Sequence, residues 1–460
     1  MPGTFSGINM ASNALRLFQR ALETTGHNIA NVNTPGYSRQ TVEFKTQYPL
    51  HYYSEGWKAL GQGVGLSQIA RIRDSYLEAS ARNSAGNMGR FETLSTSLGQ
   101  IEGIYGEPSE MGISAALDKF FDAWSALGSN PNDTGARMQV QGAGSMLASR
   151  IRNAYSQLQS FGTQLQSSAT TVVARVNELG NQIAGLNKEI RLFEGTGGMP
   201  NDLLDKRDAA VRELSGLIDT KVERFQDGSY AVYTAGHALV DTGGSRPIPA
   251  GSFDPVAGTF VASGLTYTVK GGTLAGIAQA TAQVEDQKAQ LNTLADELRE
   301  QINVPHRTGI DQDGNTGVDF FNDSVPRTGA IDFNLSAAVA ASPRAIAAGA
   351  TGLPGDGGLA LTFSQMRDVT FTALGNLSFQ DYFSANVGQV GTQAAYFKAQ
   401  MDTETAVAEQ IANQVQATSG VSLDDEMAEM MRYQRSYQAS ARALTVLDQV
   451  TEDLIGMLRR

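Results

Sequence analysis

Apolar residues recur every three or four positions at both ends of the chain. This spacing runs from Ile8 to Val32 at the amino-terminal end and from Leu423 to Leu458 at the carboxy-terminal end. Alternating steps of three and four residues are typical of a coiled-coil seam, so the sequence predicts a long helix at each end. The large seam residues are Ile8, Leu15, Phe18, Leu22 and Ile29 in the first helix, and Met427, Met430, Tyr437, Leu444, Leu447, Leu454 and Leu458 in the second.

The longest block with this spacing lies between the two ends. It runs from Val140 to Phe193 with a mean step of about 3.5 residues, which is the coiled-coil period. We predict one continuous helix over residues 134–194. Further helices are expected near residues 75–104, 112–127, 201–218, 274–303, 357–375 and 379–418.

Strand signals are confined to residues 220–272. There the pair Asp227-Gly228 separates two β-rich runs, which is typical of a hairpin, and residues 258–272 hold a second candidate pair. Residues 304–356 are rich in Gly, Pro, Asn and Asp and are predicted to form an irregular connection. The fold class is therefore mainly α with a small β region.

These elements predict a chain whose two ends pair. The expected parts are a terminal coiled-coil assembly domain (1–60 and 415–460), a helical middle domain (61–219 and 273–414), a small β-hairpin region (220–272) and the irregular connection (304–356).

A polar stretch follows the first helix and reads NIANVNTPGY from Asn28 to Tyr37. Asn28 and Asn31 lie three apart on one helical face, where their amides can bond neighbouring backbone or side chains. Pro35-Gly36 occupies the two middle positions of a predicted type II turn, which redirects the chain. Residue spacing alone fits an ordinary helix end equally well.

Composition excludes several classes of protein. Hydrophobic residues make up 41% and charged residues 18%, so the chain is not globally disordered. A net charge of -12 argues against nucleic-acid binding, and no apolar run approaches the roughly 20 residues of a membrane span. With Cys at 0, disulfides and thiolate metal sites are excluded. The first residues lack a signal-peptide pattern, so no cleaved secretory signal is expected, and export by a different route stays open.

Candidate metal sites do not match known loops. Residues 311–323 carry several Asp and Asn, but an EF-hand loop starting at Asp311 would need Gly and Glu where Thr316 and Asn322 stand. We interpret the stretch as a turn cluster, and the sequence leaves open whether it binds a cation. The histidines are too dispersed to predict a zinc pair: His27, His51, His237 and His306.

Candidate catalytic and phosphate-binding motifs are equally incomplete. Gly61, Gly63 and Gly65 are interpreted as a flexible loop because they match no phosphate-binding pattern. Asp202 and Asp205 resemble an acid–base pair, but helical spacing predicts a solvated helix start instead. We predict no catalytic residue, no cofactor and no metal.

The stretch ALETTGHNIANVNTPGYSRQ closely resembles the amino-terminal signature shared by bacterial flagellar rod, hook and hook-associated proteins. The carboxy-terminal helix resembles that of the same group, and GGMPNDLLDKRDAAVRELSGLI is similar to a stretch of the hook-associated protein 1 family. Longer members carry an outer β-rich domain after the segment that corresponds to GVDFF, and here it is absent or vestigial. The matched signature residues are Asn28, Ile29, Ala30, Asn31, Asn33, Thr34, Pro35, Gly36 and Tyr37.

This resemblance implies a non-enzymatic axial component at the hook–filament junction, outside the cell. Its implied partners are copies of itself, the hook protein, a second junction protein and an export chaperone at the carboxy-terminal segment. The seam and signature residues would form the assembly interface. A hook or rod subunit is the nearer alternative, and an enzyme acting on peptidoglycan is the further one.

The terminal helices carry too little apolar surface to order alone. Fixing about 25 residues costs about 1–2 kcal/mol each in backbone entropy, whereas each large seam residue returns only about 1.5–3 kcal/mol on burial. We therefore expect both ends to be mobile in the monomer and to pair as a coiled coil on assembly.

Overall fold

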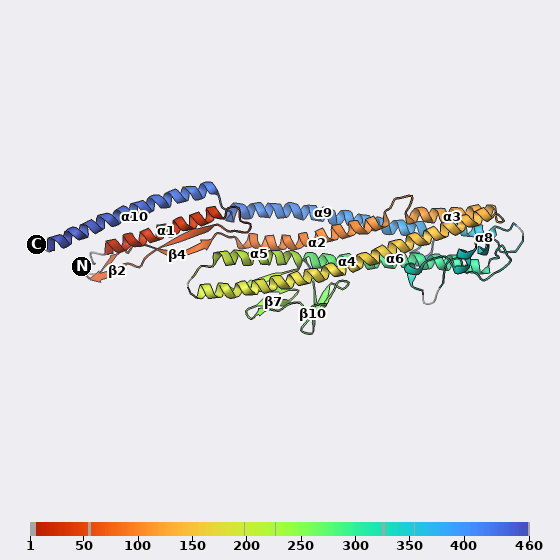
Figure 1. The fold of residues 1–460 in the computed structure, drawn as a ribbon, viewed down its shortest axis with the longest axis horizontal. Coiled ribbons are helices and arrows are strands. Elements are labelled where there is room, and N and C mark those ends of the chain that lie inside the picture. Colours follow the sequence, from red (N-terminus) through yellow and green to blue (C-terminus); the bar gives the residue numbers. More distant parts are fainter. Residues whose placement is uncertain are drawn as a thin grey trace. The chain divides into compact units, whose positions relative to one another are not determined.

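The computed structural model describes residues 6–53, 57–196, 198–225, 227–323, 327–353 and 355–458 (Figure 1). The chain divides into two compact units. The first comprises Met1–Gly86, Val176–Pro247 and Glu404–Arg460, and the second comprises Asn87–Arg175 and Ile248–Thr403. Three long helices contribute residues to both units: α2 (Ser75–Tyr105), α4 (Thr134–Gly195) and α9 (Phe379–Ser419). The single long helix predicted over residues 134–194 is confirmed by α4.

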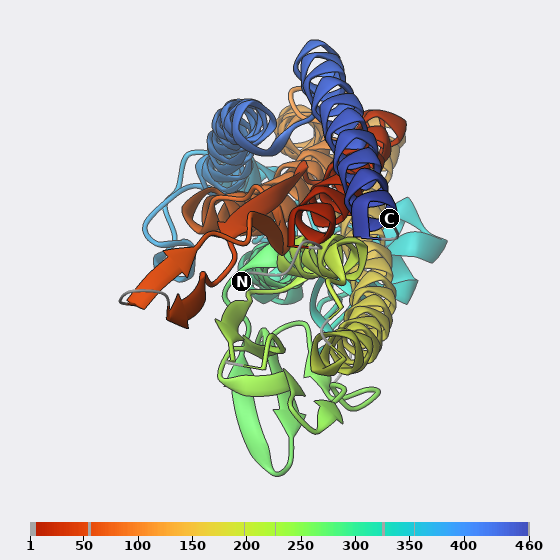
Figure 2. The same cartoon turned by 90° about the vertical axis from the view of Figure 1, so that its left-hand side faces the viewer.

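In the first unit, the helices at the two ends of the chain run side by side and antiparallel (Figure 2). They are α1 (Ser6–Ala30) and α10 (Leu423–Leu458). Gly7 lies against the side chain of Leu447, and Asn28 lies against Glu426. The predicted terminal helices are therefore present and paired within one chain.

A long hairpin packs on α1. Strands β1 (Gln40–Thr46) and β4 (Val64–Arg71) pair antiparallel, and β2 (Leu50–Tyr53) pairs with β3 (Trp57–Leu60) beyond them. The prediction that strands are confined to residues 220–272 was wrong here. The flexible-loop interpretation of the glycines was also wrong for Gly65, which pairs with Lys45 inside the hairpin, whereas Gly61 and Gly63 lie between β3 and β4. The sequence signal was weak because a bulge between Glu43 and Phe44 breaks the two-residue alternation: Val42 is buried, whereas Phe44, two residues on, is 41% exposed.

The remaining parts of the first unit are helix α5 (Asn201–Leu217) and a four-stranded antiparallel sheet. The turn at Asp227-Gly228 lies between the first two strands, as predicted, and Gly228 has a φ of 73° that favours glycine. The strands of the sheet are β5 (Lys221–Arg224), β6 (Tyr230–Thr234), β7 (His237–Asp241) and β8 (Gly244–Ser245).

The second unit has an aromatic core. Trp124 packs against Phe363, Phe320 and Phe120 at centroid distances of 4.5, 5.3 and 6.2 Å. Its further helices are α3 (Ile113–Ser129), α6 (Gly272–Thr308), α7 (Ala337–Ala341) and α8 (Gly358–Gln365). Its three-stranded sheet contains β9 (Phe253–Asp254), β10 (Thr259–Ala262) and β11 (Leu265–Thr268). Short 3-10 helices occur at Gly329–Asp332, Pro343–Ala345 and Thr372–Leu374.

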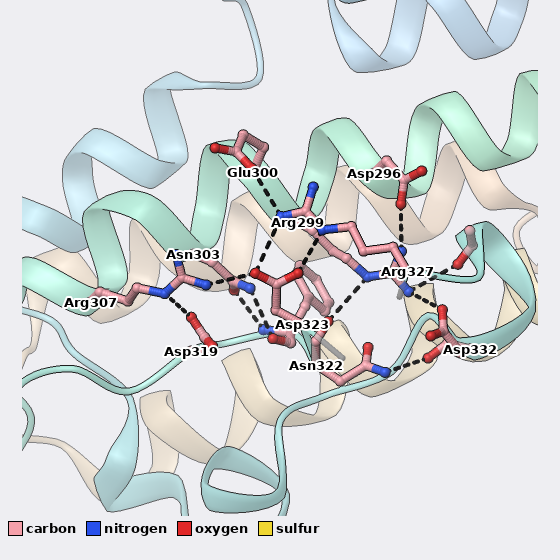
Figure 3. Close-up of polar contacts among 12 residues, drawn as sticks. Asp296, Arg299, Glu300, Asn303, Arg307, Asp319, Asn322, Asp323, Arg327 and Asp332 are labelled. Atoms are coloured by element: carbon pink, nitrogen blue, oxygen red, sulfur yellow. Dashed lines mark hydrogen bonds and ion pairs between the residues drawn. The ribbon is translucent and has the colours of Figure 1, made fainter. Parts of the chain in front are cut away.

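The predicted irregular connection begins later than expected, because α6 continues through Pro305 to Thr308. Polar side chains of α6 then bind the connection (Figure 3). Buried Arg299 donates to the carbonyls of Asn322 and Gly329 at 3.1 and 2.9 Å and pairs with Asp332. These contacts satisfy backbone groups that no regular element would satisfy, which keeps an irregular segment compact.

Candidate assembly site

The candidate site is the joint, which we define as residues 27–40 together with the side chains that bind them. Helix α1 ends at Ala30, where the Asn31 side chain donates to the His27 carbonyl at 2.9 Å. The Tyr37 amide then donates to the Thr34 carbonyl at 3.2 Å, and Gly36 has a φ of 80°. This geometry is the predicted type II turn, in which the third position needs a positive φ.

Asn28 is the centre of the joint. It is 1% exposed, and every hydrogen-bonding position of its amide is used. Its Nδ2 donates to the Gln40 carbonyl at 2.8 Å and to Glu426 Oε2 at 2.9 Å. Its Oδ1 accepts from the Gln40 amide at 3.0 Å and from the Tyr37 hydroxyl at 2.7 Å. One side chain therefore connects the end of α1, the start of β1 and the first turn of α10.

Glu426 brings the other end of the chain into the joint. Its side chain is 2% exposed, and its Oε1 accepts from Arg39 Nε at 2.6 Å. The Arg39 amide also donates to the Ser419 carbonyl at 2.9 Å, just before α10 begins. A buried carboxylate with both oxygens bound fixes position and direction more than it adds net stability. The first turn of α10 is thus held in one place relative to α1.

Helix α5 closes the joint from another side. Asp205 accepts from the Ser38 amide at 3.0 Å and from the Ser38 hydroxyl at 2.8 Å, while Arg71 binds both Asp205 and Asp208. The prediction of a solvated helix start was wrong for Asp205, which is 7% exposed, whereas Asp202 is exposed. Residue spacing within one helix could not predict that Arg71, the last residue of β4, pairs with aspartates of α5.

Burial and nearby charges keep the Tyr37 phenol protonated and the Arg71 guanidinium charged. Burial, and then the carboxylates of Asp202 and Asp205, raise the pKa of the Tyr37 phenol. The phenol therefore remains a donor to Asn28 at neutral pH. Burial lowers the pKa of Arg71, but Asp208 and Asp205 together outweigh that effect and raise it. Asp205 accepts hydrogen bonds on both oxygens and pairs with a permanent cation, so its carboxylate is engaged in holding the joint.

On α1, the predicted seam residues are not the ones that are fully buried. On α1 the buried residues are Ala11, Leu17, Ala21, Thr25 and Asn28, whereas Ile8, Leu15, Phe18, Leu22 and Ile29 are half-buried. The shift arises because α1 packs on both α10 and the hairpin: Phe18 and Leu22 contact the cluster of Leu17, Ala21, Val42 and Tyr433.

On α10 the seam is less covered. Met427, Tyr437 and Leu454 are 57%, 36% and 43% exposed, whereas Met430, Leu444 and Leu447 are half-buried. The side chain of Leu458 lies outside the described residues. On the outer side of the joint, Asn33, Thr34, Pro35 and Gly36 are exposed, and Asn31 and Tyr37 are half-buried. The exposed residues are available to a partner, and their role in assembly stays a prediction.

The carboxylates of residues 311–323 are used within the chain. Asp311 accepts from the amides of Asp313 and Asn315, both at 2.8 Å, while Asp313 pairs with Arg344. Asp319 and Asp323 pair with Arg307 (Figure 3). Within the described part of the chain, no group of three or more His, Cys, Asp or Glu side chains is arranged to hold a metal ion.

Known protein families match this chain in its middle helices and at its two ends. Residues 98–321 match the family described as "Flagellar hook-associated protein FlgK helical domain". Residues 8–37 match "Flagella basal body rod protein", and residues 412–457 match "Flagellar basal body rod FlgEFG protein C-terminal". The two rod-protein matches therefore coincide with the paired ends, α1 with its turn and α10.

Relatives match over nearly the whole length. Flagellar hook-associated protein 1 of Bacillus subtilis (strain 168) is 29% identical, with 99% of each chain covered. Flagellar hook-associated protein 1 of Escherichia coli (strain K12) is 26% identical over 550 aligned positions, covering 98% of this chain and 99% of that protein. The alignment spans more positions than the 460 residues here, because it contains gaps.

A solved structure shares the fold. The flagellar hook junction protein FlgK from Burkholderia pseudomallei aligns with a TM-score of 0.64 at 18% identity, covering 75% of this chain and 100% of that one. In the described residues no helix is long and apolar enough to cross a membrane. The middle helices and both ends match in order, and over nearly its whole length the chain is similar to flagellar hook-associated protein 1 of two bacteria.

Proposed function

We propose that this chain is a structural, axial subunit at the junction of the flagellar hook and filament, where copies pack through their paired terminal helices. The supporting observation is the joint, in which Asn28 and Glu426, 398 residues apart in sequence, share a buried hydrogen bond. The joint aligns the two ends as one unit, and that unit can then be repeated around an axis. Subunits in such an array contact each other through two different faces. Whether the array closes into a single layer therefore depends on which neighbours each face binds.

The exposed apolar side chains of α10 are the proposed surface for neighbouring copies. Among the described side chains of this 36-residue helix, Tyr433 is the one apolar residue that is buried. Leu423, Met427 and Met431 are 46%, 57% and 54% exposed near its start, and Val446, Val450 and Met457 are 62%, 49% and 74% exposed farther on. At 100° per residue these two groups fall on opposite sides of the face that meets α1. Each side then faces a different neighbour.

We restrict the proposed disorder-to-order step to the halves of α1 and α10 far from the joint. Near the joint, buried polar contacts hold the chain, whereas α10 beyond Tyr433 buries only Thr451 among its described side chains. The remaining proposed partners are the hook protein, a second junction protein and an export chaperone that covers the exposed methionines before assembly. The proposed position at the junction requires export from the cell.

Deletion of the gene tests this function. We expect a non-motile strain that still builds hooks but sheds filament protein into the medium, and restoration by the full chain. Loss of hooks would assign the protein to the rod or hook instead. Normal motility with attached filaments would refute the junction role.

A further inference from the structure

The tip of the hairpin exposes an unusual set of side chains. Tyr48, Tyr53 and Trp57 are 94%, 73% and 79% exposed, although Trp and Tyr are normally well covered in folded proteins. Tyr53 and Trp57 are directly opposite on β2 and β3, and their rings meet edge to face at 5.9 Å. We call these three residues the aromatic tip. Figure 2 shows the orange-red strands of the hairpin projecting away from α1 and α10.

The hairpin offers the tip little support within the chain. Strands β2 and β3 form a two-stranded sheet, and within the described residues neither pairs with another strand. An isolated two-stranded hairpin is marginally stable in water and normally packs its apolar face on something else. Exposed Trp and Tyr side chains on a projecting ribbon are typical of the residues that dominate protein–protein contacts.

Charge makes the tip a favourable place for contact between two copies of this chain. The chain carries a net charge of -12, so two copies repel at a distance. Residues 47–62 hold only Glu55 and Lys58 as charged residues with His51 neutral, and therefore contribute no net charge. A neutral aromatic surface is where two such acidic copies meet with least repulsion.

The size of the surface fits a repeated contact. An aromatic side chain buries about 150–250 Å² when covered, so the tip offers roughly 500 Å². A stable pairwise interface needs about 800 Å² on each partner. One tip is too small to hold a dimer in dilute solution, but it contributes where copies are already held side by side.

We propose that the aromatic tip docks on a second copy of this chain in the assembled flagellum. This inference rests on the proposed function, which brings copies side by side, and it assigns the hairpin to a contact separate from the α10 surface. The Tyr53–Trp57 pair is the anchor, and Tyr48 extends the contact.

Photo-crosslinking in isolated flagella tests the proposal. Tyr48 is replaced by p-benzoylphenylalanine, which keeps an aromatic side chain and leaves the Tyr53–Trp57 pair intact. Irradiation is expected to give an adduct of twice 48.9 kDa that contains only this chain. Adducts only with another protein, or none, would overturn the inference. The same substitution at Tyr76, 75% exposed on α2, is the matched control and should give no such adduct.

Two further measurements separate the possible failures. Wild-type chain missing from isolated flagella would refute the proposed function itself. Trp57→Ala is expected to reduce incorporation of the folded chain at least about 10-fold, as for the loss of an interface anchor, whereas Tyr76→Ala should not. Unchanged incorporation of Trp57→Ala would overturn the role of the tip while leaving the junction function intact.

Discussion

Replacement of Asn28 by alanine tests whether the joint holds the two ends of the chain together. The change removes four hydrogen bonds and leaves the amide and carbonyl of Gln40 without their partner. Glu426 keeps Arg39, and the Tyr37 hydroxyl can turn to His27, whose Nδ1 lies 3.0 Å away. The cost therefore comes mainly from the two groups of Gln40, a residue that is 9% exposed.

Each buried polar group left without a partner costs about 1–3 kcal/mol. For two such groups we expect about 3 kcal/mol, since water entering the space left by the amide recovers part of the loss. This corresponds to somewhat more than a 100-fold rise in the population in which α10 is detached from the joint. The effect should be local, because the hydrogen bonds of Asn28 go to Tyr37, Gln40 and Glu426, which all belong to the joint.

Hydrogen exchange with mass spectrometry measures this opening directly. Peptides covering residues 423–433 should exchange about 100-fold faster in Asn28→Ala, whereas peptides from α4 should not change. Asn28→Asp, which keeps the shape but places a second carboxylate beside Glu426, should open at least as much. Asn33→Ala, at an exposed position of the same turn, is the control. Wild-type exchange in both Asn28 variants would refute the account of the joint.

Two predictions concern the second unit, where the emission of buried Trp124 reports unfolding in urea. Burial lowers the pKa of His306, whose neutral ring accepts from the Ala347 amide at 2.9 Å, so the unfolded state binds the proton more tightly. Stability should be full above about pH 6.5 and fall below it by up to about 1.4 kcal/mol per pH unit. A flat profile across pH 5.5–7.5, or the same slope in His306→Gln, would contradict this. Arg299→Ala should cost about 2–4 kcal/mol, because it leaves the buried carbonyl of Gly329 and the partly buried carbonyl of Asn322 without a charged donor; a loss below 1 kcal/mol would show that the connection is held by other contacts.

Long helices with a regular apolar repeat, and turns with a specific residue pair, could be predicted from the sequence. The step of about 3.5 residues gave helix α4 to within one residue at its end, and Asp227-Gly228 located a hairpin turn. The hairpin from Gln40 to Arg71 could not be predicted in the same way. Its strands have few buried positions, and its stability comes from packing on α1, which no local pattern encodes.

Only the amino-terminal part of the joint, residues 28–37, could be predicted from the sequence. Asn28 and the turn at Pro35-Gly36 stand out because amide side chains and a Pro-Gly pair have specific backbone roles. Glu426 did not stand out, because an acidic residue in the first turn of a helix is already explained by the helix dipole. Arg71 and Asp205 were missed for a related reason: their pairing joins a strand to a helix more than a hundred residues away.

The central claim is that neighbouring copies complete the packing of α1 and α10 beyond the joint. Hydrogen exchange of peptides from residues 6–20 and 437–457, compared between dilute monomer and isolated flagella, tests it most directly. We predict exchange within seconds in the monomer and strong protection in flagella, while the middle of α4 stays protected in both. Protection of these peptides in the lone monomer equal to that of α4 would contradict the claim.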